Sequence, residues 1–164
     1  MMLAAVLEAK WEPKKEYNLS EFENNNKKAR AGSEVWRFPQ LKIKEVSLPR
    51  IKDNQVLIKI KDCGICGSDM HICESKEDGY INYPGYTKFP IIIGHEFSGI
   101  VVERGSKVKD LDVGDMIVGD NMIWCGKCIA CRNGFPTHCK NLEEFGFTLN
   151  GAFAEYIAIN TKYC

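Results

Sequence analysis

The chain has 164 residues, in which 22 Lys and Arg balance 22 Asp and Glu, so its formal net charge is zero. Hydrophobic residues make up 45% and charged residues 27%, which suits a folded core and excludes a disordered chain or a long coiled coil. Phosphate recognition needs a positive surplus, and a membrane span needs an apolar run of about 20 residues. Neither is present, so we expect no nucleic-acid partner and no membrane partner.

The first residues are apolar but lack the basic segment that begins a secretory signal. We interpret Met1 to Glu8 as a first β-strand of a cytoplasmic protein. The segment after it, residues 12–39, contains Asn24 to Lys28 and few aliphatic side chains. It is predicted to be a surface insertion with one short helix around Ser20 to Lys28. A lid or subunit contact built on its aromatic residues is the alternative.

Short strands dominate the remainder of the chain. The segment Val56 to Lys61 alternates apolar and charged residues, which is the period of a half-buried strand. Four further runs are short, rich in apolar residues and bounded by turn residues: Leu41–Lys44, Phe97–Glu103, Met116–Val118 and Phe153–Ile159. No long helical period occurs. This pattern predicts a mainly β domain, a small barrel or a sandwich.

A second insertion-like stretch, residues 77–89, is rich in aromatic side chains, namely Tyr80, Tyr83, Tyr86 and Phe89. These rings can close a small satellite core or line a pocket. The two interpretations have equal support from the sequence.

The chain has eight cysteines, and in a protein without a secretory signal such a number indicates metal binding or catalysis. Four of them have spacings of two, two and seven residues: Cys125, Cys128, Cys131 and Cys139. These spacings allow four thiolates to converge on one zinc ion, and a site closed by four thiolates is structural. Two disulfides, an iron–sulfur cluster, or His138 in place of Cys139 are the alternatives. Three other cysteines have no assigned role: Cys63, Cys73 and Cys164.

A second potential ligand set contains three different residue types. Cys66 lies in a glycine-rich turn after the strand at 56–61, and His95 and Glu96 follow an apolar run. A thiolate, an imidazole and a carboxylate form the mixed set that a catalytic zinc uses when one coordination position stays open. Each residue alone has a common structural explanation, so the combination carries the interpretation.

Four motifs in register resemble the zinc-containing medium-chain alcohol dehydrogenases. The segment 94–108 is similar to the family's signature, 64–71 is similar to its first-ligand segment, and the four-cysteine lobe and residues 151–156 follow in the family's order. The segments 77–89 and 124–126 look most like polyol-type members, including threonine, sorbitol and scyllo-inosose dehydrogenases. The resemblance implies a mainly β, GroES-like, partly open barrel over residues 1–164, with a zinc-binding lobe at 120–142 and a few short helices.

The resemblance also assigns roles to individual residues. It makes Cys66, His95 and Glu96 ligands of a catalytic zinc, and it makes Ser68 and His71 the relay that carries the alcohol's proton to solvent. A relay is needed because a proton released in a dry pocket requires an exit route. Two acidic residues, Asp69 and Asp62, could orient ligands, although roles in a turn or at a strand end account for them equally well.

The implied function is oxidation of a secondary alcohol or polyol to a ketone by hydride transfer to NAD or NADP. The intact enzyme would hold two zinc ions per chain and form a homo-oligomer, a dimer or a tetramer. A Gly-x-Gly-x-x-Gly turn of a nicotinamide-binding domain is missing here, and the fourth catalytic-zinc ligand is expected after residue 164, so we expect this chain alone to be inactive. A non-enzymatic zinc-lobe interaction module and a metal-free co-chaperonin-like ring are the rival interpretations.

Overall fold

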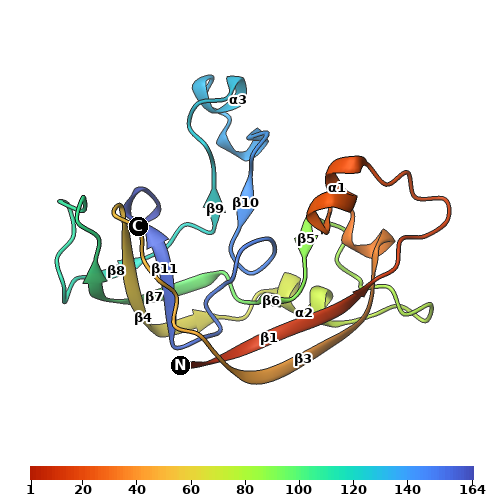
Figure 1. Cartoon of the computed structure of the whole chain (residues 1–164), viewed down its shortest axis with the longest axis horizontal. Coiled ribbons are helices and arrows are strands. Elements are labelled where there is room, and N and C mark those ends of the chain that lie inside the picture. Colours follow the sequence, from red (N-terminus) through yellow and green to blue (C-terminus); the bar gives the residue numbers. More distant parts are fainter.

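The computed structural model describes all residues from Met1 to Cys164. The strands, which Figure 1 labels where space allows, are β1 Met2–Trp11, β2 Lys28–Ala29, β3 Trp36–Val46, β4 Gln55–Gly64, β5 Thr87–Lys88, β6 Ile91–Ile92, β7 Glu96–Arg104, β8 Met116–Val118, β9 Met122–Ile123, β10 Glu143–Glu144 and β11 Tyr156–Asn160. The helices are α1 Glu21–Asn26, α2 Gly67–Cys73 and α3 Ile129–Arg132, with 3₁₀ turns η1 Gly32–Glu34, η2 Pro136–His138 and η3 Thr161–Tyr163. No helix has both the length and the hydropathy that a bilayer crossing demands.

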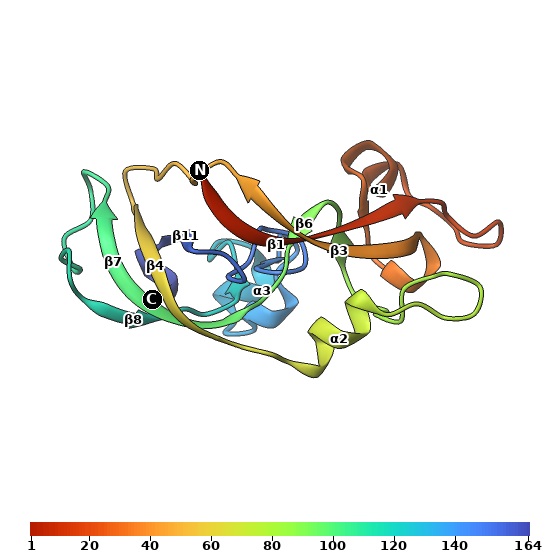
Figure 2. The same cartoon turned by 90° about the horizontal axis from the view of Figure 1, so that it is seen from below.

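The larger sheet has the strand order β11-β4-β7-β8, and all its pairs are antiparallel. Strand β4 alternates as predicted only from Ile58 onward, where Lys59 and Lys61 are exposed; Val56, Leu57 and Ile58 are all buried. Figure 2 shows β4 and β7 running side by side as long curved strands. Their apolar side chains, with those of β11 and η3, form the larger of the buried clusters.

The second sheet has the order β3-β1-β6. Strand β1 pairs with β3 along nearly its whole length, from Met2 opposite Val46 to Trp11 opposite Trp36. The two sheets meet where the backbone N–H of Ala5 donates to the carbonyl of Phe153 at 2.8 Å. They do not close into a barrel, so the prediction of a mainly β, partly open fold with a few short helices is confirmed.

Segment 12–39 differs from the expected surface insertion. A short helix, α1, does form within it, but Val35 and Trp36 are 0% and 3% exposed, and Trp36 already belongs to β3. Trp36 packs edge-on against Trp11 and Phe89, with ring centroids 4.8 and 4.9 Å apart. The segment therefore builds a second core, because its few apolar side chains meet aromatic residues that are distant in the sequence.

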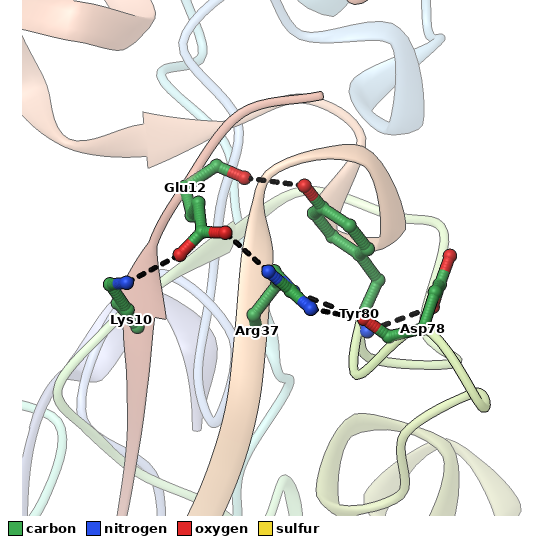
Figure 3. A network of polar contacts seen from close by, with 5 residues as sticks. All are labelled: Lys10, Glu12, Arg37, Asp78 and Tyr80. Carbon is green, nitrogen blue, oxygen red and sulfur yellow. Dashed lines mark hydrogen bonds and ion pairs between the residues drawn. The ribbon is translucent and has the colours of Figure 1, made fainter. Parts of the chain in front are cut away.

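A network of polar contacts fastens segment 74–89 to this second core, as Figure 3 shows. Arg37 forms an ion pair with Glu12 and donates to the carbonyl of Asp78 at 3.1 and 2.6 Å. The hydroxyl of Tyr80 donates to the carbonyl of Glu12 at 2.9 Å. Tyr80 therefore has a structural role. Of the four aromatic residues of this stretch, only Tyr83 lies near the mixed ligand set: its ring stacks on Phe147, and Phe147 packs against the ring of His95.

The strands β9 and β10 pair with each other and carry the four-cysteine lobe away from both sheets, which is visible in Figure 1 as an arm ending at α3. None of the residues of α3 is buried. Four free cysteines, Cys125, Cys128, Cys131 and Cys139, lie in and around this helix.

Candidate metal sites

The pairing of β4 with β7 assembles the mixed ligand set. In this antiparallel ladder Gly64, the last residue of β4, lies opposite Glu96, the first residue of β7. Cys66 follows β4 by two residues and His95 directly precedes β7, so both lie at the same end of the ladder. The possible ligand atoms of Cys66, His95 and Glu96 all lie within 4.8 Å of one another.

Gly64 lies close against the Glu96 side chain. A Cβ atom at residue 64 would lie 2.6 Å from Glu96 Oε2, which is closer than real Cβ contacts allow. A side chain at residue 64 would therefore force the Glu96 carboxylate to shift.

His95 is oriented by a buried acid. Its Nδ1 atom lies 3.4 Å from Asp69 Oδ1; both atoms are buried, and neither has another partner. The close carboxylate of Asp69, more than any other neighbour, raises the pKa of His95 to about 9. Burial would raise the pKa of Asp69, but His95 and the N–H of Cys66, at 2.9 Å, outweigh it and lower that pKa.

This arrangement leaves Nε2 of His95 for the site, where Ser68 Oγ lies 3.4 Å away. Hydrogen bonds from Ser68 also lower the pKa of the Cys66 thiol, with His95 contributing. An imidazole whose outer nitrogen is fixed by a carboxylate and whose inner nitrogen faces a thiolate matches the way proteins hold zinc. The residues present therefore fit a zinc ion.

The other candidates near this set are placed differently. His71 is exposed, forms no hydrogen bond with Ser68, and lies 3.9 Å from Glu74. Asp62 lies on the exposed part of β4 and accepts a hydrogen bond from Ser98 at 3.4 Å. Of the two acids named from the sequence, Asp69 contacts a candidate ligand and Asp62 does not.

The four cysteines of the arm also converge, with their Sγ atoms within 4.8 Å of one another. Backbone N–H groups point at these sulfurs: the N–H of Cys125 lies 3.3 Å from Cys139 Sγ, and the N–H of Cys128 lies 3.4 Å from Cys125 Sγ. Donors from Lys127 and Cys128 lower the pKa of Cys125 to about 6, which favours the thiolate that zinc requires. His138 is exposed and lies outside the cluster.

Two residues beside the mixed set were not identified from the sequence. Phe147 packs against the His95 ring on one side and stacks on Tyr83 on the other, with ring centroids 4.9 Å apart in both cases. Glu144, three residues before it, has its pKa raised by burial. Both residues are far from His95 in the sequence, and no local pattern marks either of them. The only related signal in the sequence was the aromatic-rich stretch that contains Tyr83, for which pocket lining was one of the two interpretations.

Comparison with known proteins gives a consistent result. Residues 52–164 match the family described as the alcohol dehydrogenase GroES-like domain. The chain is 47% identical over 169 residues to a scyllo-inosose 3-dehydrogenase of Thermotoga maritima, covering 99% of this chain and 43% of that protein.

Two solved structures are also similar. One is a protein of Thermotoga maritima assigned as an alcohol dehydrogenase, with a TM-score of 0.95, 45% identity, and coverage of 99% of this chain and 43% of that one. The other, from Sinorhizobium meliloti, was solved with NADP bound and is assigned as a zinc-binding dehydrogenase; its TM-score is 0.67, its identity 30%, and the coverage is 99% of this chain and 37% of that one. The chain thus spans less than half the length of these relatives.

Proposed function

Because the chain belongs to the alcohol dehydrogenase family, as its GroES-like domain, we propose that the protein containing it oxidises a secondary alcohol group of a polyol to a ketone, with NAD or NADP as the hydride acceptor. Two of its relatives are dehydrogenases by name, one of scyllo-inosose and one described as zinc-binding and bound to NADP. The observation that carries the proposal is the convergence of Cys66, His95 and Glu96 within 4.8 Å, with His95 held by a buried carboxylate.

In this proposal Cys66, His95 and Glu96 hold the catalytic zinc. When bound, zinc supplies a Lewis acid that polarises the alcohol oxygen. Asp69 keeps the outer nitrogen of His95 engaged, so the inner nitrogen stays available as a ligand. Ser68 Oγ is the first acceptor of the alcohol proton, and His71, one turn further along α2, passes that proton to solvent.

The four-cysteine cluster is proposed to hold a second, structural zinc, which gives two zinc ions per chain in the intact enzyme. Its donors are all thiols, and a fully thiolate-ligated tetrahedral site has no open position for substrate. Residues 1–164 contain no Gly-x-Gly-x-x-Gly turn, so the nicotinamide is proposed to bind to another part of the protein. We therefore expect these residues alone to transfer no hydride.

The test compares zinc-loaded full-length protein with its His95→Ala variant, using polyols as substrates and NAD or NADP as the acceptor. Reduced nicotinamide is followed by absorbance, and we expect turnover to fall by about a thousandfold or more, since an imidazole ligand of the ion is lost. His138→Ala is the matched control, because this histidine is exposed and outside both clusters. Near-normal turnover of His95→Ala would refute the assignment.

A further inference from the structure

Glu144 is a half-buried carboxylate that has no partner in the chain. Its backbone groups are used, since its N–H donates to Thr148 Oγ1 at 2.8 Å and its carbonyl accepts from a following turn. Its side chain forms neither a hydrogen bond nor an ion pair, and its oxygens are not sealed from solvent. A carboxylate that loses part of its water without gaining a donor is costly, so a ligand that supplies donors would recover that cost.

The neighbouring residue, Glu143, has an ion-pair partner, and its position shows which way the Glu144 side chain points. Glu143 forms an ion pair with Lys28, which joins the arm to segment 12–39. Successive side chains of a strand point to opposite faces, so Glu144 points away from Lys28. The turn that begins at Glu144 places Phe147 against the His95 ring, with ring centroids 4.9 Å apart, so Glu144 lies on the side of the mixed ligand set.

The turn after Glu144 forms one wall of that site. The N–H groups of Phe147, Thr148 and Leu149 all donate to the carbonyl of Glu144. Phe147 in this turn lies against the His95 ring at 4.9 Å, and Gly146 packs on Gly94 so closely that a Cβ atom would lie 3.0 Å from the Gly94 carbonyl oxygen. The position of Glu144 relative to His95 is therefore fixed by packing.

Tyr83 provides a hydroxyl on the same wall. Its ring stacks on Phe147, half-buried, and its hydroxyl has no hydrogen-bond partner in the chain and is not sealed from solvent. Because Phe147 also packs against the His95 ring, this stacking places Tyr83 on the same side of the mixed ligand set. One acceptor and one hydroxyl, both unpaired, thus flank the aromatic ring that covers His95.

From this arrangement we infer that Glu144 and Tyr83 bind the non-reacting hydroxyl groups of a polyhydroxylated substrate, and that Glu144 selects such substrates over simple alcohols. The inference rests on the proposed function, because it concerns the same site. A carboxylate accepts hydrogen bonds from two adjacent hydroxyls, whereas an alcohol with a single hydroxyl offers none once that group reacts. A site with buried polar groups rejects analogues that leave those groups unpaired.

The experiment uses zinc-loaded full-length protein and two ring alcohols, myo-inositol and cyclohexanol. Dissociation constants are measured by NMR titration without nicotinamide, and kcat and KM are measured with it. We expect Glu144→Gln to weaken binding of myo-inositol by about tenfold or more and to raise its KM, because one charge-assisted acceptor is lost. Binding of cyclohexanol should change by less than about twofold, and Tyr83→Phe should show the same pattern more weakly.

Glu143→Gln is the matched control, because it removes an adjacent carboxylate that faces Lys28. It should leave the preference for myo-inositol intact. An unchanged preference in Glu144→Gln, or wild-type protein that binds both alcohols equally, would overturn the inference. Absence of turnover in the wild type, with binding of myo-inositol still dependent on Glu144, would count against the proposed dehydrogenase function and not against this inference.

Discussion

A buried pair, His95 and Asp69, decides how the mixed ligand set is presented. The carboxylate of Asp69 accepts from the N–H of Cys66 with one oxygen and faces the imidazole of His95 with the other. One acid thereby links two candidate ligands that come from different elements. Asp69 therefore fixes the position of Cys66 at the start of α2 and also sets the charge that faces the His95 ring.

Replacing this acid should weaken metal binding. We expect Asp69→Asn to lower the affinity for zinc at the mixed set by about 10- to 100-fold, because the outer nitrogen of His95 loses its charged acceptor. Competition with a chromophoric chelator measures the affinity. Asp62→Asn, on exposed β4, is the control and should leave it unchanged. Equal affinities for both variants would show that Asp69 does not support the ligand.

At the scale of single elements, helix α1 depends on one side chain, that of Glu23, for its hydrogen bonds to the surrounding segment. Ser20 and Glu23 form a reciprocal cap at its start, and Glu23, only 2% exposed, also accepts from Tyr17 at 2.7 Å and from the N–H of Arg30 at 2.9 Å. The Glu23 carboxylate thus accepts hydrogen bonds both from residues before α1 and from a residue after it. Burial alone would raise its pKa, but the hydrogen bonds from Ser20, Arg30 and Tyr17 outweigh it and lower the pKa to about 2.

The lowered pKa of Glu23 predicts acid sensitivity. A group whose folded pKa lies below its ordinary value of 4.5 stabilises the fold above that pH and loses its contribution as pH falls towards 2. Glu23→Gln should therefore lower the free energy of unfolding by about 2 kcal/mol at neutral pH and flatten its pH dependence in that window. Urea denaturation across this range measures both effects.

The control for this prediction is Glu21→Gln, which changes an exposed carboxylate of the same helix. It should leave the steepness of the acid transition unchanged. The same acid dependence in Glu23→Gln as in the parent would contradict a structural role for the carboxylate.

Local patterns account for part of these elements and of the site. The alternation at 56–61 and the cysteine spacings act over short distances, so the strand β4 and the four-cysteine cluster could be predicted. Helix α2 could not, since its seven residues carry a ligand motif and no apolar period. The burial of Trp36 and the proximity of Phe147 to His95 depend on contacts between distant segments, which no local pattern records.

At the scale of the whole molecule, the two large buried clusters hold the body of the fold, and the arm stands outside them. The larger sheet and the second core are held by apolar packing, whereas the arm projects from them with α3 fully outside any core. The arm is attached at its base by Trp124, whose carbonyl accepts a hydrogen bond from Tyr163 and whose ring lies 3.3 Å from Lys162 Nζ. In its outer part, residues 125–140, the only buried residues are the cysteines Cys128 and Cys139.

Removal of metal should therefore affect the arm and spare the sheets. We expect a chelator, or Cys128→Ser, to abolish hydrogen-exchange protection of residues 125–140 while the amides of β4 and β7 stay protected. Exchange followed by mass spectrometry locates the change. Cys164→Ser, at an exposed cysteine outside the cluster, is the control. Loss of protection in both sheets as well would show that the arm supports the entire fold.

The pairing of Gly64 with Glu96 also determines where related chains can differ in length. The excursion between these residues leaves the ladder at one point and returns to it at the opposite point, so its ends are fixed whatever its length. A related chain could therefore carry a longer or shorter stretch between α2 and β6 while Gly64 and Glu96 keep their spacing. A change of length there would leave the end of the ladder that carries Cys66 and His95 in place.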